Sequence, residues 1–379
     1  MNVKKLLIAV LVPALFFILF PINAIAFDEK YYTDKIDIQQ IINSLPESAK
    51  QYVPSDIFSS DNISEIPSKI DSETLRDYTL NVVQRLSKNT LTNLVSLLII
   101  IVLISLINTS KNTLASDSFQ KGIEYITTLV LSVYTYQIIS RSLAFLSDFL
   151  KVLDVLINAL IPIMAMLYSL GGNVSSAVVS TSGISLAITA TNYAVQHIFL
   201  PSIKVCYGLI LASKISGIKG ISHIEKTIRN FLTTTLVGTT TLFSVFLIFK
   251  TNISVASDSL AARTIRFAGS FIPVIGSPLG ESVRTVMTGV SMIKSSVGFV
   301  GIFILLITTL PTVIQVIITK FTFDITATLS YVLGNEKEGD FLKNISSIFN
   351  FLIAVTVTIC VLFLLELTVF VFVSPALGG

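Results

Sequence analysis

The side chains that could perform catalysis in this chain are few and far apart. Gly183-Ile184-Ser185 has the Gly-x-Ser form used by intramembrane serine proteases, which need a histidine within hydrogen-bond reach of the serine. The sequence has 2 histidines, His197 and His223. His197 follows Ser185 by twelve residues in one apolar run, about 18 Å along a helix, and His223 falls in a basic loop. We therefore expect no catalytic dyad.

The sequence also lacks the residue patterns that form metal sites, nucleotide-binding loops and nucleic-acid-binding surfaces. Two lone histidines do not supply a zinc cluster, and Cys206 and Cys360 lie in apolar runs, where a thiol behaves as a small hydrophobic side chain. The sequence contains no GxxxxGK phosphate loop, no HExxH and no basic stripe interleaved with aromatic residues. The prediction is a protein that is not an enzyme and binds no cofactor, metal or nucleic acid.

Glycine and proline are concentrated in one apolar segment, FAGSFIPVIGSPLG, residues 267–280. Its two prolines and three glycines would leave backbone groups unpaired in hydrocarbon, so we do not expect an ordinary spanning helix. At membrane depth such a re-entrant or broken segment must be buried in protein or line a watery cavity. An interfacial loop with no conducting role is the alternative. The candidate residues here are Arg263, Arg266, Gly269, Pro273, Gly276, Pro278 and Gly280.

Charged residues inside apolar runs are the other candidates for a pathway. Lys204 and Glu366 lie deep in their runs, and they could pair with one another or face an aqueous lumen. Arg141 and Asp154 lie near run ends, where their side chains could reach the interface. These charges are too few for the carboxylate relay of a proton-driven pump.

The elements that would position these residues are bilayer-length apolar runs. Hydrophobic residues make up 52% of the chain and charged residues 13%, which indicates a polytopic, all-α membrane bundle surrounded by lipid. Pro201 and Lys204 interrupt one stretch, so we expect about 7–8 spans. The runs are Leu91 to Ile107, Ile123 to Leu146, Val152 to Leu170, Ile184 to Leu200, Ile203 to Ile215, Phe231 to Phe249, Val297 to Thr319 and Ile348 to Val373.

Three regions follow from this pattern. Residues 1–26 form a signal peptide, because two lysines precede a short apolar run that ends in Ala24-Ile25-Ala26. A retained first span is the alternative. Residues 27–90 are polar with apolar residues at helical spacing, which predicts a short extracytoplasmic region of amphipathic helices. Residues 91–379 form the polytopic membrane domain.

Positive charge orients the spans. Lys111 and Lys121 should hold the first loop in the cytoplasm, and the basic loop from Lys214 to Arg229 should lie there as well. Starting from an outside N-terminus, both conditions hold only if Ile184 to Ile215 crosses twice or forms a re-entrant pair. The basic loop could also be a docking site for an ATPase partner.

The stretch SDSLAARTIRFAGSFIPVIGSPLGESVRTVMTGVSMIKSSVGFVGI, Ser257 to Ile302, resembles the signature of the stage III sporulation protein AE family of endospore-forming bacteria. The LPESAKQYVP segment at Leu45 to Pro54, the signal sequence and the polytopic body are similar to that family as well. The resemblance covers essentially the whole chain, but only ARTIRFAGSFIPVIG is distinctive. It carries no enzymatic motif.

The resemblance implies a non-enzymatic subunit placed by the mother cell in the outer forespore membrane, with its N-terminal region in the intermembrane space. Its expected partners are sister stage III sporulation proteins and a forespore-made protein across that space. The assembly is expected to act as a channel or secretion-like complex. An autonomous secondary transporter is the competing hypothesis, although it predicts inverted repeats and the sequence has one clear Gly/Pro-broken element.

Overall fold

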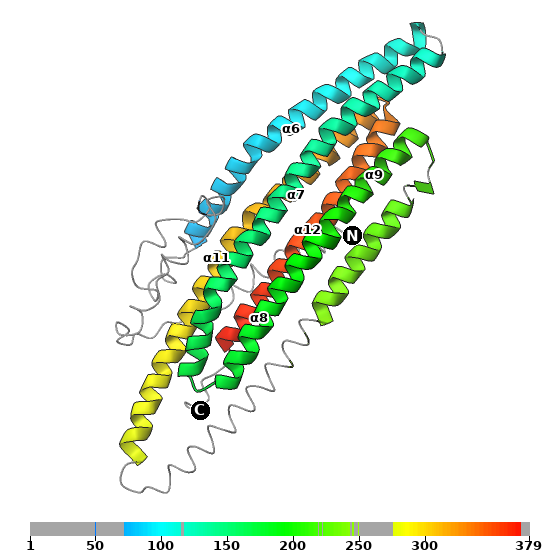
Figure 1. Ribbon diagram of the computed structural model, residues 1–379. Coiled ribbons are helices and arrows are strands. Elements are labelled where there is room, and N and C mark those ends of the chain that lie inside the picture. Colours follow the sequence, from blue (N-terminus) through cyan, green and yellow to red (C-terminus); the bar gives the residue numbers. More distant parts are fainter. Residues whose placement is uncertain are drawn as a thin grey trace.

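The computed structural model describes residue 50 and residues 72–114, 117–218, 220–221, 223–242, 245, 249 and 276–372. Every regular element among these residues is helical, which confirms the predicted fold class. The signal peptide and most of the predicted exported region lie outside them. The long helices lie side by side in an elongated bundle (Figure 1). They are α6 (Ser72–Leu114), α7 (Asp117–Leu170), α8 (Val174–Ala194), α9 (Leu200–Ser216), an unlabelled helix over residues 223–242, α11 (Gly276–Val332) and α12 (Glu336–Phe372). The chain reverses direction at each turn between them, whereas α8 and α9 run in the same direction (Figure 1).

Helix α7 joins two apolar runs that the sequence suggested were separate crossings. Ile123 to Leu146 and Val152 to Leu170 lie on one helix of 54 residues, about 81 Å long. The linking residues 147–151 contain neither glycine nor proline, and Lys151 pairs with Asp148 at 2.8 Å on the same helix. Nothing therefore ends the helix between the runs. A helix of this length cannot hold both runs within one hydrocarbon layer of about 30 Å.

The stretch from Ile184 to Ile215 is also a single rod, so the expected pair of crossings there is wrong. Helix α8 continues into a π-helical turn, η1 (Val195–Phe199), and then into α9. The N–H of Leu200 bonds to the carbonyl of Val195, five residues earlier. This wider turn lies immediately before Pro201, which occupies the first turn of α9, where a missing N–H is tolerated.

The chain reverses at glycines instead. Gly172, Gly217 and Gly334 have φ values of 76°, 71° and 77°, in the left-handed region that glycine adopts without strain. Gly172 lies in the turn between α7 and α8, where the N–H of Asn173 bonds to the carbonyl of Tyr168 at 2.9 Å. A left-handed glycine at such a position ends the helix and lets the chain reverse.

Five helical stretches of the described residues are long and apolar enough to cross a membrane. They are Arg76–Thr109, Ser118–Leu170, Thr189–Ser216, Ser295–Val332 and Glu336–Leu365. The number is lower than the predicted 7–8 because four of the predicted runs are joined into two rods. Residues 243–275, where a further run ends, are largely outside the description.

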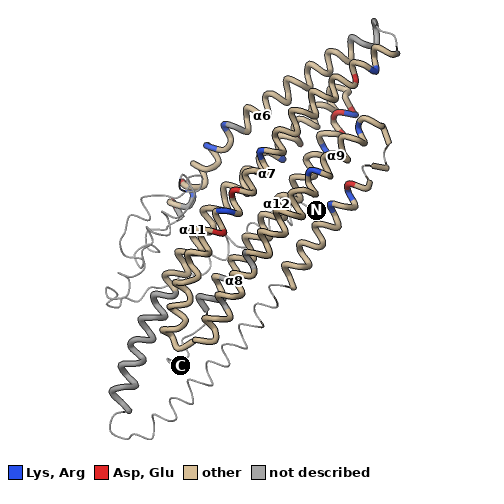
Figure 2. The backbone as a smooth tube through the Cα atoms, in the orientation of Figure 1, with Lys and Arg blue, Asp and Glu red and all other residues tan. Residues whose placement is uncertain are grey.

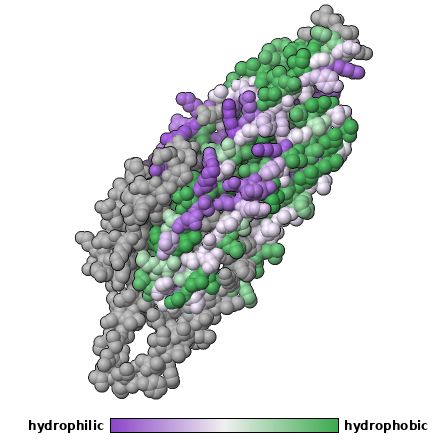
Figure 3. All heavy atoms as spheres, viewed as in Figure 1, coloured by the Kyte–Doolittle hydropathy of each residue, from purple (hydrophilic) through white to green (hydrophobic). Residues whose placement is uncertain are grey.

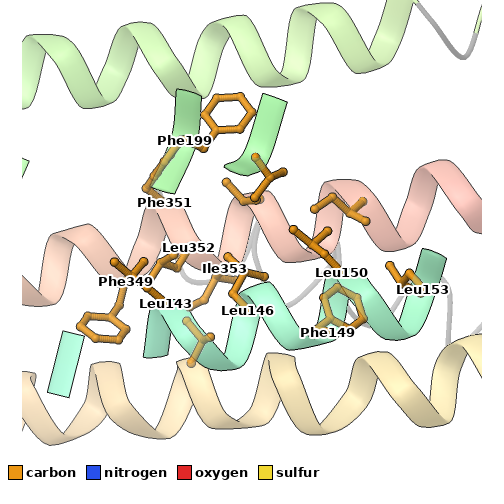
Figure 4. Close-up of a cluster of buried hydrophobic side chains, with 14 of the residues drawn as sticks. Leu143, Leu146, Phe149, Leu150, Leu153, Phe199, Phe349, Phe351, Leu352 and Ile353 are labelled. Carbon is orange, nitrogen blue, oxygen red and sulfur yellow. The ribbon is translucent and has the colours of Figure 1, made fainter. Parts of the chain in front are cut away.

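Helices α11 and α12 form the centre of the bundle. In the most apolar part of α11, 78% of residues are buried, compared with 22% in α6. Side chains from α7, α12 and the π-helical turn meet in one apolar cluster (Figure 4). Within it, the rings of Phe199 and Phe351 pack edge to face at 5.7 Å. In a membrane protein such packing is driven by van der Waals contact rather than by exclusion of water.

A tyrosine fixes α6 against α11 at a proline. Pro311 has no N–H, so the carbonyl of Ile307 loses its usual partner four residues later in α11. The hydroxyl of Tyr78 in α6 donates a hydrogen bond to that carbonyl at 2.8 Å. The register of α6 is therefore set by a backbone group that only proline leaves available.

Candidate functional site

Three chain reversals meet at one end of the bundle, which we call the turn end. They are the α6–α7 turn, the α9 turn at residues 217–222 and the α11–α12 turn at residues 333–335. The amide nitrogen of Asn108 donates to Asn335 at 2.9 Å, and Lys337 pairs with Glu124. These contacts tie α6, α7 and α12 together. The turn end therefore joins segments that are far apart in the sequence through polar contacts.

A buried ion pair joins α9 to α12 at this end. The Nζ atom of Lys214 lies 3.2 Å from Oε1 of Glu338, and the two side chains are only 6% and 7% exposed. Lys214 also lies over the ring of Phe341, 5.0 Å from its centroid. Burial disfavours each charge alone, so each requires the other.

A second buried pair joins residues 223–242 to α12. Arg229 contacts Oε1 of Glu225 at 3.0 Å and also donates to Ser347 of α12. Burial raises the pKa of the Glu225 carboxyl above its ordinary value, and the Arg229 guanidinium opposes that shift. The ion pair with Arg229 thus offsets much of the cost of removing the Glu225 carboxylate from water.

Asp324 forms a third polar cluster, between α11 and α12. Its carboxylate accepts from Lys320, from Lys343 at 2.7 Å and from Ser346 at 2.8 Å. Three partners satisfy this carboxylate, so the cluster fixes the α11–α12 register and leaves no group for catalysis.

The turn between α7 and α8, at the opposite end of the bundle, is uncharged. Helix α8 has no charged residue along Val174–Ala194, and the turn before it is Gly-Gly-Asn. Figure 2 shows charged residues at the turn end and midway along α6 and α7, whereas the α7–α8 turn is uncharged. The α7–α8 turn therefore differs in charge from the turns at the turn end.

The structure does not bring the predicted site residues together. Arg263, Arg266, Gly269 and Pro273 lie outside the described residues, so the broken segment is untested there. Gly276, Pro278 and Gly280 lie in the first turns of α11, where proline is compatible with a helix. Of this stretch only the helical backbone is described.

Lys204 and Glu366 lie too far apart to pair. Lys204 is exposed on α9, and Glu366 is near the end of α12. The contacts Lys214–Glu338 and Phe199–Phe351 set the antiparallel register, which places Lys204 level with Ser347. Nineteen residues of α12 separate Ser347 from Glu366, about 28 Å along the helix.

Sequence reasoning missed the buried pairs at the turn end. Lys214 and Arg229 were read as basic loop residues available to a partner, but their acidic partners are Glu338 and Glu225. Glu225 follows the helical i, i+4 rule with Arg229, and that spacing could have revealed the pair. Glu338 lies 124 residues from Lys214, and no local pattern indicates it.

No group of three or more metal-binding side chains occurs among the residues described here. The helices, their lengths and the polar turn end define a polytopic helical membrane protein without a recognisable catalytic centre in that part of the chain. The family model described as "Stage III sporulation protein AE" matches residues 59–374. The chain belongs to the stage III sporulation protein AE family.

One curated relative supports the assignment. The chain is 24% identical over 280 residues to Stage III sporulation protein AE of Bacillus subtilis (strain 168), an alignment that covers 73% of this chain and 69% of the relative. No solved structure matches.

Proposed function

We propose that this chain is a non-enzymatic membrane subunit of the assembly that connects mother cell and forespore during endospore development. Family membership over residues 59–374 supports a role in sporulation. The observation that carries the structural part of the proposal is the contrast between the charged turns at the turn end and the uncharged turn between α7 and α8.

The turn end faces the mother-cell cytoplasm in this proposal. All three turns lie on one side of the bundle, because the two merged rods leave an even number of passes between the basic loops. The lysines of the first loop and the basic residues from Lys214 to Arg229 therefore share one compartment, as the positive-inside rule requires. The exported N-terminal region then lies in the intermembrane space of the outer forespore membrane.

Docking of a cytoplasmic ATPase subunit would use the exposed part of the turn end. Lys214 and Arg229 are engaged in buried pairs, whereas Lys226 and His223 are exposed on the helix over residues 223–242. The partner therefore contacts this helix rather than the whole basic loop. Sister stage III sporulation proteins contact the bundle within the membrane and on the exported side.

Affinity purification from sporulating cells tests the proposal. The tagged chain should co-purify with sister stage III proteins, and Lys226→Glu should reduce recovery of a cytoplasmic partner. Lys204→Glu is the matched control, because Lys204 is an exposed lysine ten residues below Lys214 on α9. Solute uptake by the chain alone in liposomes, with no sister protein recovered from cells, would instead establish an autonomous transporter.

A further inference from the structure

The exposed surface of α6 changes character at one height. Beyond Thr90 its exposed side chains are mainly large and apolar, as at Leu91, Val95 and Ile99. Before Thr90 they are mainly polar. The exposed polar residues of this half are Glu73, Arg76, Asp77, Asn81, Gln84, Arg85 and Lys88.

Helix α7 changes at the same height. The hydroxyl of Tyr134 lies 3.5 Å from Oδ1 of Asn93, which aligns the two antiparallel helices close to Thr90. No large hydrophobic side chain described on α7 is exposed between Tyr136 and Met166. The exposed positions from 137 to 158 are Gln137, Arg141, Ala144, Asp148, Lys151 and Asn158, spaced as one helical face. We call this face, with the polar half of α6, the polar band.

Hydrophilic side chains gather midway along the visible surface, over α6 and α7, with hydrophobic ones on either side (Figure 3). Lys151 and Asp148 are 62% and 52% exposed, so they are not buried structural charges. Asp154, level with them, accepts from Asn192 of α8 at 3.3 Å. The polar band is thus continuous across neighbouring helices.

The inner face of the same α7 stretch packs against the longest apolar run of α12. Leu143, Leu146 and Phe149 lie in one cluster with Phe349 and Ile353 (Figure 4). On α6, the Tyr78 contact places the polar half beside Ile307 in the apolar run of α11. The polar band therefore lies at the height at which the central helices have bilayer-length apolar sequence.

Charged side chains at this height are incompatible with lipid contact. Each would cost about 2.5–3.5 kcal/mol near the centre of a hydrocarbon layer. Near the centre of a hydrocarbon layer the interface is about 15 Å away, which is farther than the short side chain of Asp148 reaches. A face of this kind within a membrane faces water or a polar protein surface.

On the far side of α12, the helix over residues 223–242 exposes different side chains at the same height. Arg229 contacts Ser347, so Val237 is level with Val355, eight residues further along each helix. Val237 is half exposed and Leu242 more so. These side chains suit contact with hydrocarbon.

We propose that the polar band of α6 and α7 lines an aqueous passage formed between this chain and neighbouring subunits, while the helix over residues 223–242 faces lipid. This inference rests on the proposed function, since a passage requires the assembly. It assigns the passage to charged residues of α7 and the exported half of α6 rather than to the glycine–proline segment.

Thiol accessibility in membranes from sporulating cells tests the assignment. Cys206→Ala and Cys360→Ala give a background without thiols, since both native cysteines are buried and the chain has only 2. Single cysteines are then placed at Asp148 and Arg141 in the polar band and at Val237 on the helix over residues 223–242. A positively charged, membrane-impermeant methanethiosulfonate should modify positions 148 and 141 at least about tenfold faster than position 237, because a charged reagent is strongly disfavoured in hydrocarbon.

Equal, slow reaction at 148 and 237 would refute the passage, because the polar band would then be covered by protein or lipid. Equal, fast reaction at both would also refute it, because that height of the bundle would lie outside the bilayer. Recovery of sister proteins with the tagged background chain is measured in parallel. If position 148 reacts slowly while sister proteins are recovered normally, the passage is refuted and the proposed function stands. If the chain without substitutions recovers no sister proteins, the proposed function itself is refuted.

Discussion

Replacing Tyr78 with phenylalanine tests how α6 is fixed in the bundle. The substitution keeps the ring and removes the hydroxyl that donates to the Ile307 carbonyl at 2.8 Å. That carbonyl has no intrahelical donor, because residue 311 is proline. Leaving a carbonyl unpaired costs about 1–3 kcal/mol, and hydrogen bonds between helices in membrane proteins are at the lower end. We expect Tyr78→Phe to lower the free energy of unfolding by about 1 kcal/mol.

The decisive measurement is a double-mutant cycle with Pro311→Ala. Alanine restores an N–H at position 311, which can bond to Ile307 within α11, so Tyr78→Phe should cost less than half as much in that background. Unfolding of the purified chain in mixed micelles, followed by circular dichroism, gives all four free energies. Tyr134→Phe is a control, since its hydroxyl has only a 3.5 Å contact. Equal costs of Tyr78→Phe in both backgrounds would refute the role given to the proline.

Three further outcomes are expected at the turn end and the chain reversals. Lys214→Met should destabilise the chain by about 3 kcal/mol in the same assay, because it leaves the Glu338 carboxylate buried without a partner. The double variant Lys214→Met/Glu338→Leu should lose much less stability, because no buried charge remains. A double variant no more stable than Lys214→Met would contradict this. Burial raises the pKa of the Glu225 carboxyl in the folded chain. The free energy of unfolding of the natural chain should therefore fall, relative to that of Glu225→Gln, as pH rises through that pKa. Unfolding both chains at about pH 4 and about pH 7 measures the difference. Gly334→Ala should cost about 1–2 kcal/mol because φ is 77°, while Gly208→Ala, in open space on α9, should be neutral or stabilising.

The all-helical class of fold could be predicted from the sequence, because an apolar run of bilayer length must pair its backbone groups internally and does so as a helix. It did not reveal how the runs are joined. The charged residues 148–154 of α7 separate two apolar runs and so indicated a boundary between two helices. Asp148 and Lys151 instead form an ion pair at helical spacing, and no glycine or proline between the runs ends the helix. Pro201 looked like a break, and the preceding π-helical turn accommodates it. Sequence periodicity does not show which hydrogen-bond pattern precedes a proline.

The candidate residues divide in the same way. Arg141 and Asp154 were assigned to run ends from which they could snorkel, but they lie midway along α7 because its two runs are one helix. Recognising the polar band required knowing which positions are exposed and how α6 aligns with α7. Neither property is local to a sequence window. The family resemblance, by contrast, rested on a continuous stretch and was confirmed directly.

The unbroken course of α7 has a mechanical consequence. The part of α7 before Pro162 is about 67 Å long and behaves as a lever, so a tilt of about 5° at the turn end moves its other end by about 6 Å. A small displacement of the loops at the turn end would thus be amplified at the other end of this segment, with no need for the segment itself to bend.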